Sequence, residues 1–158
     1  MQPQTHSPLT TVFSDVLSDL AFMFTDDEPA ETSPGSLWLE GTIRYQGPVS
    51  GELRVLCPME FTRLLAANLL GIDADDAEAE ARSPDALREF LNVLCGQFVT
   101  AAYGHDKVFD LSIPQARVLS ETPTELGRDD DDARVFNVEG HCVQLIHRQD
   151  TGEHATQH

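Results

Sequence analysis

Hydrophobic residues recur at helical spacing in three segments of the chain. An apolar residue returns every three or four positions over 8–24, 61–69 and 84–103, which predicts three amphipathic helices. Gly71 and Gly104 stand where the second and third segments end, as expected of residues that terminate helices. The third segment is the longest and carries the polar residues that bear on function.

Alternating apolar and polar residues predict strands between and after these helices. The alternation covers 37–45 and 49–55, and the Gln-Gly-Pro that separates them predicts a turn, so the two form a hairpin. It returns over 109–119. The segments 134–139 and 141–147 form either a second hairpin or one bent strand with a bulge. We expect loops over the acidic or polar stretches 25–35, 72–82 and 122–132.

These elements predict an α+β fold with two layers. Hairpins imply an antiparallel-rich β-sheet, and the amphipathic helices must bury their apolar sides against one face of that sheet. A length of 158 residues suits a single domain. We expect the chain, 1–158, to form that domain, with an ordered core over about 8–147 and a polar flexible tail over 148–158.

The acidic composition excludes some classes of partner. The chain holds 27 Asp and Glu residues against 10 Lys and Arg, a formal net charge of −17. A field of that sign repels nucleic acid and anionic membranes, so we expect neither as a partner. No apolar run approaches the roughly 20 residues of a membrane span. The first residues lack a basic region followed by an apolar one, so we expect no secretory leader.

The cysteine pattern favours a structural role in a reducing compartment. Cys57, Cys95 and Cys142 each lie in an apolar stretch, and none belongs to a CxxC motif. Buried free thiols in the cytoplasm explain this pattern better than a metal or catalytic role does. His and Cys residues show no metal-ligand spacing, so we expect no metal site and no cofactor of the chain's own.

One row of polar residues follows the long helical segment. With about 100° per residue, Asp85, Glu89, Asn92 and Gly96 fall within a sector of roughly 60°. The opposite side of the helix is apolar and completes a core face without them: Leu87, Leu91, Leu94, Phe98 and Ala102. The row should therefore point outward, and Val99 and Tyr103 should continue it as apolar surface.

Asn and Gly are weak helix formers, which makes their place on an exposed stripe unusual. Relative to Ala, Asn costs about 0.6 kcal/mol and Gly about 1 kcal/mol in a helix interior. An outward carboxylate, Glu89, can pair with a cation on another molecule, and the amide of Asn92 can hold a water in a chosen orientation. Gly96 allows close approach. The alternative is that the row arose by chance, since most exposed Glu and Asn residues are inert, and that Asp85 only stabilises the helix start.

The row resembles the signature of the CheC/CheX/FliY family of chemotaxis phosphatases. That signature is an Asp or Ser, then Glu, then Asn, then a distant Pro, and here it reads Asp85-x3-Glu89-x2-Asn92 with Pro114 after 21 further residues. In the family a glycine falls four residues after the Asn, as Gly96 does. ExxN occurs once in this chain, whereas CheC has two such helices, so the resemblance is to CheX, over about 8–147.

The resemblance implies a phosphatase that hydrolyses the aspartyl phosphate of a CheY-like response regulator. Asn92 would orient the attacking water, and Glu89 would pair with the regulator's lysine. Asp85 would contribute less directly at the helix start, and Pro114 would shape the strand that enters the sheet. Mg²⁺ would belong to the regulator. The resemblance also implies a homodimer that pairs through its sheets.

Two further points remain open from the sequence. The alternative function is a non-catalytic CheX-like binding or scaffold module in chemotaxis, flagellar-switch or two-component signalling, and the sequence does not name the regulator. Because response-regulator pockets are acidic, the charge of −17 opposes encounter unless a basic patch compensates, and Arg63, Arg82 and Arg88 are the candidates. Gln97 stands where relatives often have Asn, and we assign it no direct role.

Overall fold

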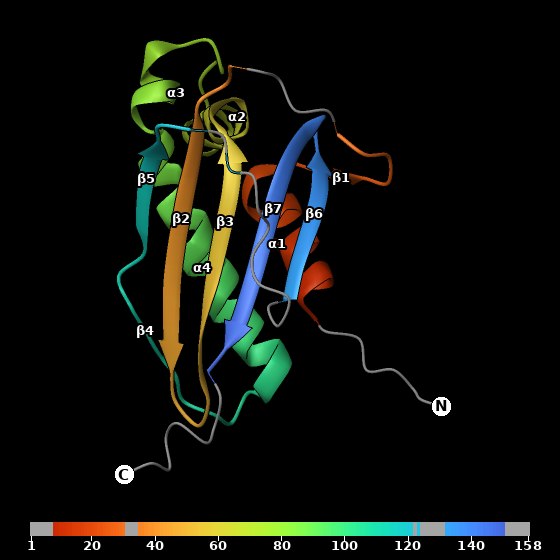
Figure 1. The fold of residues 1–158 in the computed structure, drawn as a ribbon, viewed down its shortest axis with the longest axis vertical. Coiled ribbons are helices and arrows are strands. Elements are labelled where there is room, and N and C mark those ends of the chain that lie inside the picture. The colour runs from red at the N-terminus through yellow and green to blue at the C-terminus, as the bar shows by residue number, and fades with distance from the viewer. Residues whose placement is uncertain (1–7, 31–34, 122, 124–131, 151–158) are drawn as a thin grey trace.

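The computed structural model describes residues 8–30, 35–121, 123 and 132–150. Four helices and seven strands follow one another along these residues (Figure 1). The helices are α1 (Leu9–Ala21), α2 (Met59–Leu70), α3 (Ala77–Ala81) and α4 (Ser83–Tyr103). The strands are β1 (Thr25–Asp26), β2 (Trp38–Gln46), β3 (Ser50–Pro58), β4 (Asp110–Leu111), β5 (Gln115–Leu119), β6 (Asp132–Val138) and β7 (His141–Gln149).

The strands form one antiparallel sheet in the order β1-β6-β7-β3-β2-β4, with β5 also paired to β2. β2 and β3 form the first predicted hairpin. β6 and β7 form the second hairpin rather than one bent strand, and Gly140 in their turn adopts φ +86°, which an L-residue rarely takes. The pairing of β3 with β7 joins the two hairpins into one sheet.

The helices α1, α2 and α4 cover one face of this sheet, the far face in Figure 1. Alternate residues of the central strands point to that face and are buried, as the period of two predicts: Leu39, Ile43, Tyr45, Leu53, Val55, Val143 and Leu145. They meet the buried sides of the three helices in one core. The predicted α+β, two-layer architecture with an antiparallel sheet is therefore confirmed.

Gly41 brings α4 close to the sheet. A Cβ built on Gly41 would lie 2.6 Å from Leu91 Cδ1 and 3.0 Å from Leu87 Cδ2, closer than real Cβ contacts. Only a residue without a side chain leaves room at this point of β2 for two leucines of α4. The inner side of α4 is thus fixed against the middle of β2, and its other side is left for the surface.

Three local features differ from the expectations. α1 ends at Ala21 rather than at about residue 24, because Phe22 adopts the left-handed conformation (φ 56°) and its N–H donates to Ser18 O. A bulky residue at this position is uncommon, so composition does not reveal the end. The expected loop 25–35 contains β1, and the acidic connector 72–82 contains α3, whose Asp76 side chain accepts from Glu78 N at 2.9 Å.

The end of the chain and the edge of the sheet also differ. The expected strand over 109–119 is two strands, β4 and β5, on the same edge of β2. β7 runs to Gln149, beyond the expected core limit of 147, and Arg148 pairs with Glu52 at 3.4 Å. Residues 151–158 of the expected tail lie outside the described residues.

Two general properties of the chain follow from the coordinates. In the part of the chain that the structure describes, no helix is long and apolar enough to cross a membrane. Cys57, Cys95 and Cys142 are buried free thiols, as the sequence predicted.

Candidate functional site

The long helix α4 is defined at both ends by local sequence. Pro84 occupies its first turn, where its missing N–H costs no hydrogen bond. Ser83 is buried and donates its hydroxyl to Ala79 O at 3.0 Å, so it ties α4 to α3 instead of capping the helix as a side-chain acceptor. Gly104 ends the helix, with φ +107° and its N–H donated to Thr100 O.

The structure places the polar row on the outer side of α4, as helical spacing predicts. Asp85, Glu89 and Asn92 are exposed, whereas Gly96 is partly buried. Of the residues predicted for the core side, Ala102 is partly buried and the others are buried: Leu87, Leu91, Leu94 and Phe98. A carboxylate and an amide therefore project into solvent from a helix whose opposite side is held by the core.

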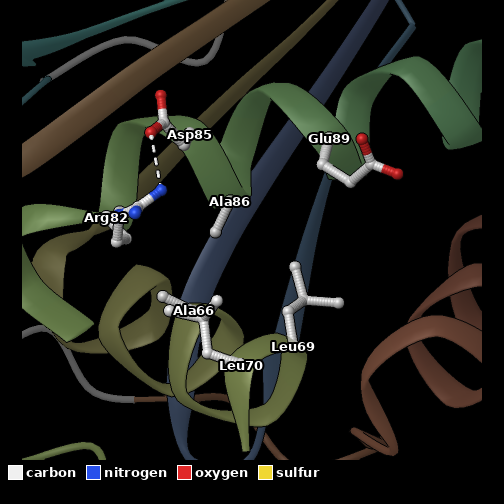
Figure 2. A pocket seen from close by; sticks show the side chains of 7 residues that line it. All are labelled: Ala66, Leu69, Leu70, Arg82, Asp85, Ala86 and Glu89. Atoms are coloured by element: carbon white, nitrogen blue, oxygen red, sulfur yellow. Dashed lines mark ion pairs between the residues drawn. The ribbon is translucent and has the colours of Figure 1, made fainter. Parts of the chain in front are cut away.

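Asp85 differs from the other members of the row because it is already paired. Its carboxylate makes an ion pair with Arg88. It makes a second one, at 3.8 Å, with Arg82 (Figure 2). Arg82 also pairs with Glu78 at 2.9 Å. This exposed network at the start of α4 suits the helix dipole, which favours a negative charge in the first turn. The Asp85 carboxylate is thus occupied by ion pairs at the start of the helix and is not a free ligand.

Glu89 and Asn92 are unpartnered by comparison. Neither side chain makes a hydrogen bond or ion pair with another described residue. In Figure 2 the Glu89 carboxylate points away from Arg82 and Asp85 and toward the middle of α4. Both polar groups are consequently free to meet a group on another molecule, one turn apart along a rigid helix.

Gly96 is not required by the fold. A Cβ at this position would meet only Leu111 Cδ1, at 4.0 Å, which is ordinary van der Waals contact. Its carbonyl accepts from Thr100 Oγ1 at 3.1 Å, and its φ lies outside the left-handed region. Because glycine weakens a helix interior by about 1 kcal/mol relative to alanine, its presence here needs a reason other than packing.

Pro114 lies at an irregularity of the sheet edge. Leu111 pairs with Tyr45 and Gln115 pairs with Thr42, so five residues, 111–115, face four residues of β2. The extra residue separates β4 from β5, and Pro114, which has no N–H to donate, immediately precedes β5. Pro114 therefore lies at the entry to β5, in an edge segment whose two strands contact α4.

The far end of α4 corrects one expectation. Val99 is buried, at 5% exposure, and Tyr103 is partly buried, so neither continues the row as exposed surface. The Tyr45 hydroxyl lies 3.0 Å from Tyr103 Oη and 2.8 Å from His147 Nε2, and Tyr103 donates to Gln149 Oε1 at 2.9 Å. Tyr103 thus connects this end of α4 to strands β2 and β7, and these contacts keep its side chain partly buried.

The buried ionisable groups next to α4 are poor nucleophiles. Burial raises the pKa of the Cys95 thiol to about 12, and burial together with the Tyr103 hydrogen bond raises the pKa of Tyr45 above its ordinary range. Both groups stay protonated near neutral pH and face the core. Neither group is therefore an activated nucleophile.

A pocket that the sequence did not reveal lies beside the row. It has a volume of about 140 Å³, opens to solvent and lies between α2 and the first half of α4 (Figure 2). Its lining residues are Ala66, Leu69, Leu70, Arg82, Asp85, Ala86 and Glu89. The sequence hint was Leu70, an apolar residue outside the helical stripe of 61–69 and 47% exposed in the structure.

The arginines do not form the free basic patch that we considered. Arg82 and Arg88 pair with acids of their own helix turn, and Arg63 pairs with Glu80 at 3.2 Å. The remaining arginines within the described ranges are also in ion pairs: Arg44, Arg54, Arg117, Arg134 and Arg148. In these ranges, no group of three or more His, Cys, Asp or Glu side chains is placed to hold a metal ion.

Comparison with known proteins places this arrangement in a family. The family model described as "Chemotaxis phosphatase CheX" matches residues 39–135, more than half of the chain, and this range includes the whole of α4 and Pro114. No curated protein sequence matches the chain.

Solved structures of similar fold carry the same family names. A chemotaxis protein CheX from Desulfovibrio desulfuricans superposes with a TM-score of 0.66 at 16% identity, covering 90% of this chain and 97% of that one. A CheX–CheY–BeF3–Mg²⁺ complex from Borrelia burgdorferi gives 0.65 at 20% identity, covering 91% and 96%. A CheC-like superfamily protein from Shewanella sp. PV-4 gives 0.65 at 17% identity, also covering 91% and 96%.

At such identities these structures show the shared fold, whereas the family match covers the helix with the Glu89–Asn92 pair. The chain belongs to the chemotaxis phosphatase CheX family.

Proposed function

We propose that this chain hydrolyses the aspartyl phosphate of a CheY-like response regulator, as a single CheX-like domain. The observation that carries the proposal is the pair Glu89 and Asn92, exposed and without a partner among the residues that the structure describes, on a helix that the core fixes from the other side. Family membership supplies the reaction class. The complex of a Borrelia burgdorferi CheX with CheY, BeF3 and Mg²⁺ supplies the class of partner.

In the proposed mechanism the two side chains act on the partner's active site. Glu89 forms an ion pair with a lysine of the regulator and fixes where α4 docks. The amide of Asn92 holds a water in line with the phosphorus atom. The water oxygen forms the new P–O bond while the bond to the aspartyl oxygen breaks, which yields inorganic phosphate and a free aspartate carboxylate.

The remaining members of the row assist this reaction. Asp85 keeps Arg82 and Arg88 at the start of α4, and Gly96 leaves the helix surface bare where the partner approaches. Mg²⁺ held by the regulator would neutralise charge on the phosphoryl oxygens. Positioning by the chain and charge stabilisation by the partner together account for catalysis without a nucleophile on this chain.

The test compares two exposed amides of the same helix. Phosphorylated regulator is incubated with wild type, with Asn92→Ala and with Gln97→Ala, and loss of phosphate is followed with time. Gln97 is exposed but lies roughly 140° around the helix from Asn92. We expect Asn92→Ala to lose about 100-fold in rate while it still binds the regulator, and Gln97→Ala to stay within about twofold of wild type. Equal rates for wild type and Asn92→Ala would contradict the mechanism.

The same assay separates the enzyme from a binding module. The net charge of −17 and the paired arginines favour the second reading, in which the chain binds a regulator or scaffold without hydrolysis. In that case wild type would bind the regulator and leave its phosphate in place.

We also propose a cytoplasmic homodimer. The three buried free thiols fit a reducing compartment, and the sheet offers edges for pairing at β1 and at the β4–β5 side. A mass measurement in solution tests this: a monomeric mass would contradict the dimer and leave the proposed catalytic site untouched.

A further inference from the structure

The pocket between α2 and α4 shares its rim with the proposed catalytic row. Leu69 and Leu70 of α2 form one wall, and Ala86 of α4 faces them across the pocket (Figure 2). Asp85 and Glu89 lie on the α4 side of the same opening. In Figure 2 the carboxylate of Glu89 points away from the pocket, so its aliphatic stem lines the wall while its charge stays outside.

The size and lining of the pocket suit a single apolar side chain. Its volume is about 140 Å³, and an apolar cavity of about 150 Å³ accepts one benzene molecule. The side chains that form its floor are small or aliphatic, and Leu70 is 47% exposed although it lies next to a buried part of α2. An exposed leucine beside an open apolar cavity is a surface that gains free energy when another apolar group covers it.

The charge of the chain favours such a short-range contact. The aspartyl phosphate of the substrate is negatively charged, and the chain has a net charge of −17. Each arginine within the described ranges is already in an ion pair, including Arg82, which lines the pocket. Long-range electrostatics therefore opposes the encounter, and short-range contacts have to hold the complex together.

We infer that this pocket receives one aliphatic or aromatic side chain of the phosphorylated regulator, adjacent to the cation that pairs with Glu89. The inference rests on the proposed function, because the occupant belongs to the same partner. It adds an apolar anchor next to an ion pair, the arrangement of a small hot spot. Leu70 and Leu69 would then determine affinity for the regulator, while Asn92 determines the rate of hydrolysis.

The experiment uses two leucines of equal exposure. Leu70→Ser removes the exposed wall of the pocket, and Leu37→Ser changes a leucine that is 49% exposed and lies outside the pocket. Both are measured for KM and kcat on phosphorylated regulator and for binding to beryllofluoride-activated regulator. We expect Leu70→Ser to raise KM and Kd about tenfold with kcat within about twofold, and Leu37→Ser to match wild type.

A second measurement tests the electrostatic argument first on wild type, whose stability is unchanged. The association rate of wild type with activated regulator is measured at low and high salt. We expect it to rise with salt, because screening weakens the repulsion, and we expect Leu70→Ser to keep that dependence while its dissociation rate increases. An association rate that falls with salt would overturn the electrostatic argument.

The outcomes distinguish the inference from the proposed function. If wild type hydrolyses the phosphate and Leu70→Ser matches it in KM and Kd, the pocket inference is wrong and the function stands. If wild type neither binds nor hydrolyses, both are wrong. If Leu70→Ser instead abolishes self-association of the wild-type chain and leaves regulator binding unchanged, the occupant is a second copy and the inference is overturned.

Discussion

The two ends of α4 differ in how many contacts their side chains make. Near its start, Glu89 and Asn92 project from the helix without partners among the described residues. Near its end, the aromatic ring of Tyr103 is tilted against that of Tyr45 with 5.9 Å between the ring centroids, and its hydroxyl is hydrogen-bonded on two sides. Phe98 adds ring contacts with His147 at 4.7 Å and with Tyr45 at 6.2 Å.

This difference shows how one helix can hold a site in place without touching it. Ring contacts and hydrogen bonds at the far end, together with Gly41 under the middle, fix the axis and the rotation of α4. A catalytic amide has to be positioned within a fraction of an ångström. The near end can leave its polar groups unpaired because the far end supplies the rigidity.

The strongest test of the comparison removes the anchor. Phe98→Ala deletes a buried ring at 2% exposure, and we expect the free energy of unfolding to fall by about 3–5 kcal/mol in urea denaturation. Val93→Ala, on the same helix but only partly buried, should cost about 1 kcal/mol. A loss for Phe98→Ala no larger than that for Val93→Ala would show that the far end does not anchor the helix.

A smaller effect is expected from charge reversal at the near end. Glu89→Lys places a cation opposite the regulator's lysine, and we expect binding of activated regulator to weaken by at least about tenfold while the unfolding midpoint changes little. Asp106→Lys changes the net charge equally just beyond the far end of α4, at a residue whose side chain is 84% exposed. Calorimetric titration should find that Asp106→Lys binds activated regulator with unchanged affinity. Similar losses of affinity in both variants would show that Glu89 acts only through the net charge of the chain.

The smallest effect separates two glycines. Gly96→Ala should stabilise the chain by up to about 1 kcal/mol, because a Cβ fits there, and should slow dephosphorylation if the partner approaches this surface. Gly41→Ala should destabilise the chain by about 1–3 kcal/mol, because its Cβ would meet Leu91 at 2.6 Å. Thermal melts show whether each substitution raises or lowers the melting temperature. A lower melting temperature for Gly96→Ala would show that the fold requires this glycine.

Local patterns were sufficient for most of the elements. The first hairpin and the long helix were predicted because apolar residues alternate or recur along one stretch of chain, and Gly71, with φ +74°, ends α2 as predicted. The second hairpin was one of two alternatives that the alternation allowed. The missed strand β1 has a cause outside its own stretch of chain. β1 exists only because Thr25 and Asp26 pair with β6, more than a hundred residues later, and such pairing leaves no periodic trace in two residues.

In the candidate site, too, spacing predicts which residues share a face but not which of them are paired. The spacing of Asp85, Glu89 and Asn92 was enough to place them on one outer face, and the motif was enough to suggest the family. Spacing could not show that Asp85 is paired with Arg82 and Arg88 whereas the other two are free, because ion pairs depend on rotamers and neighbours.

The sequence by itself determined which side of α4 is apolar, that the sheet is antiparallel, and which carboxylate and amide share a stripe, because these properties follow from the fixed periods of helix and strand. Only the tertiary structure decided where that stripe stays open. α4 crosses the sheet so that Tyr45 and His147 hold its far end, while α2 leaves a pocket beside its near end. Contacts between residues distant in sequence set that geometry, and no local period encodes them.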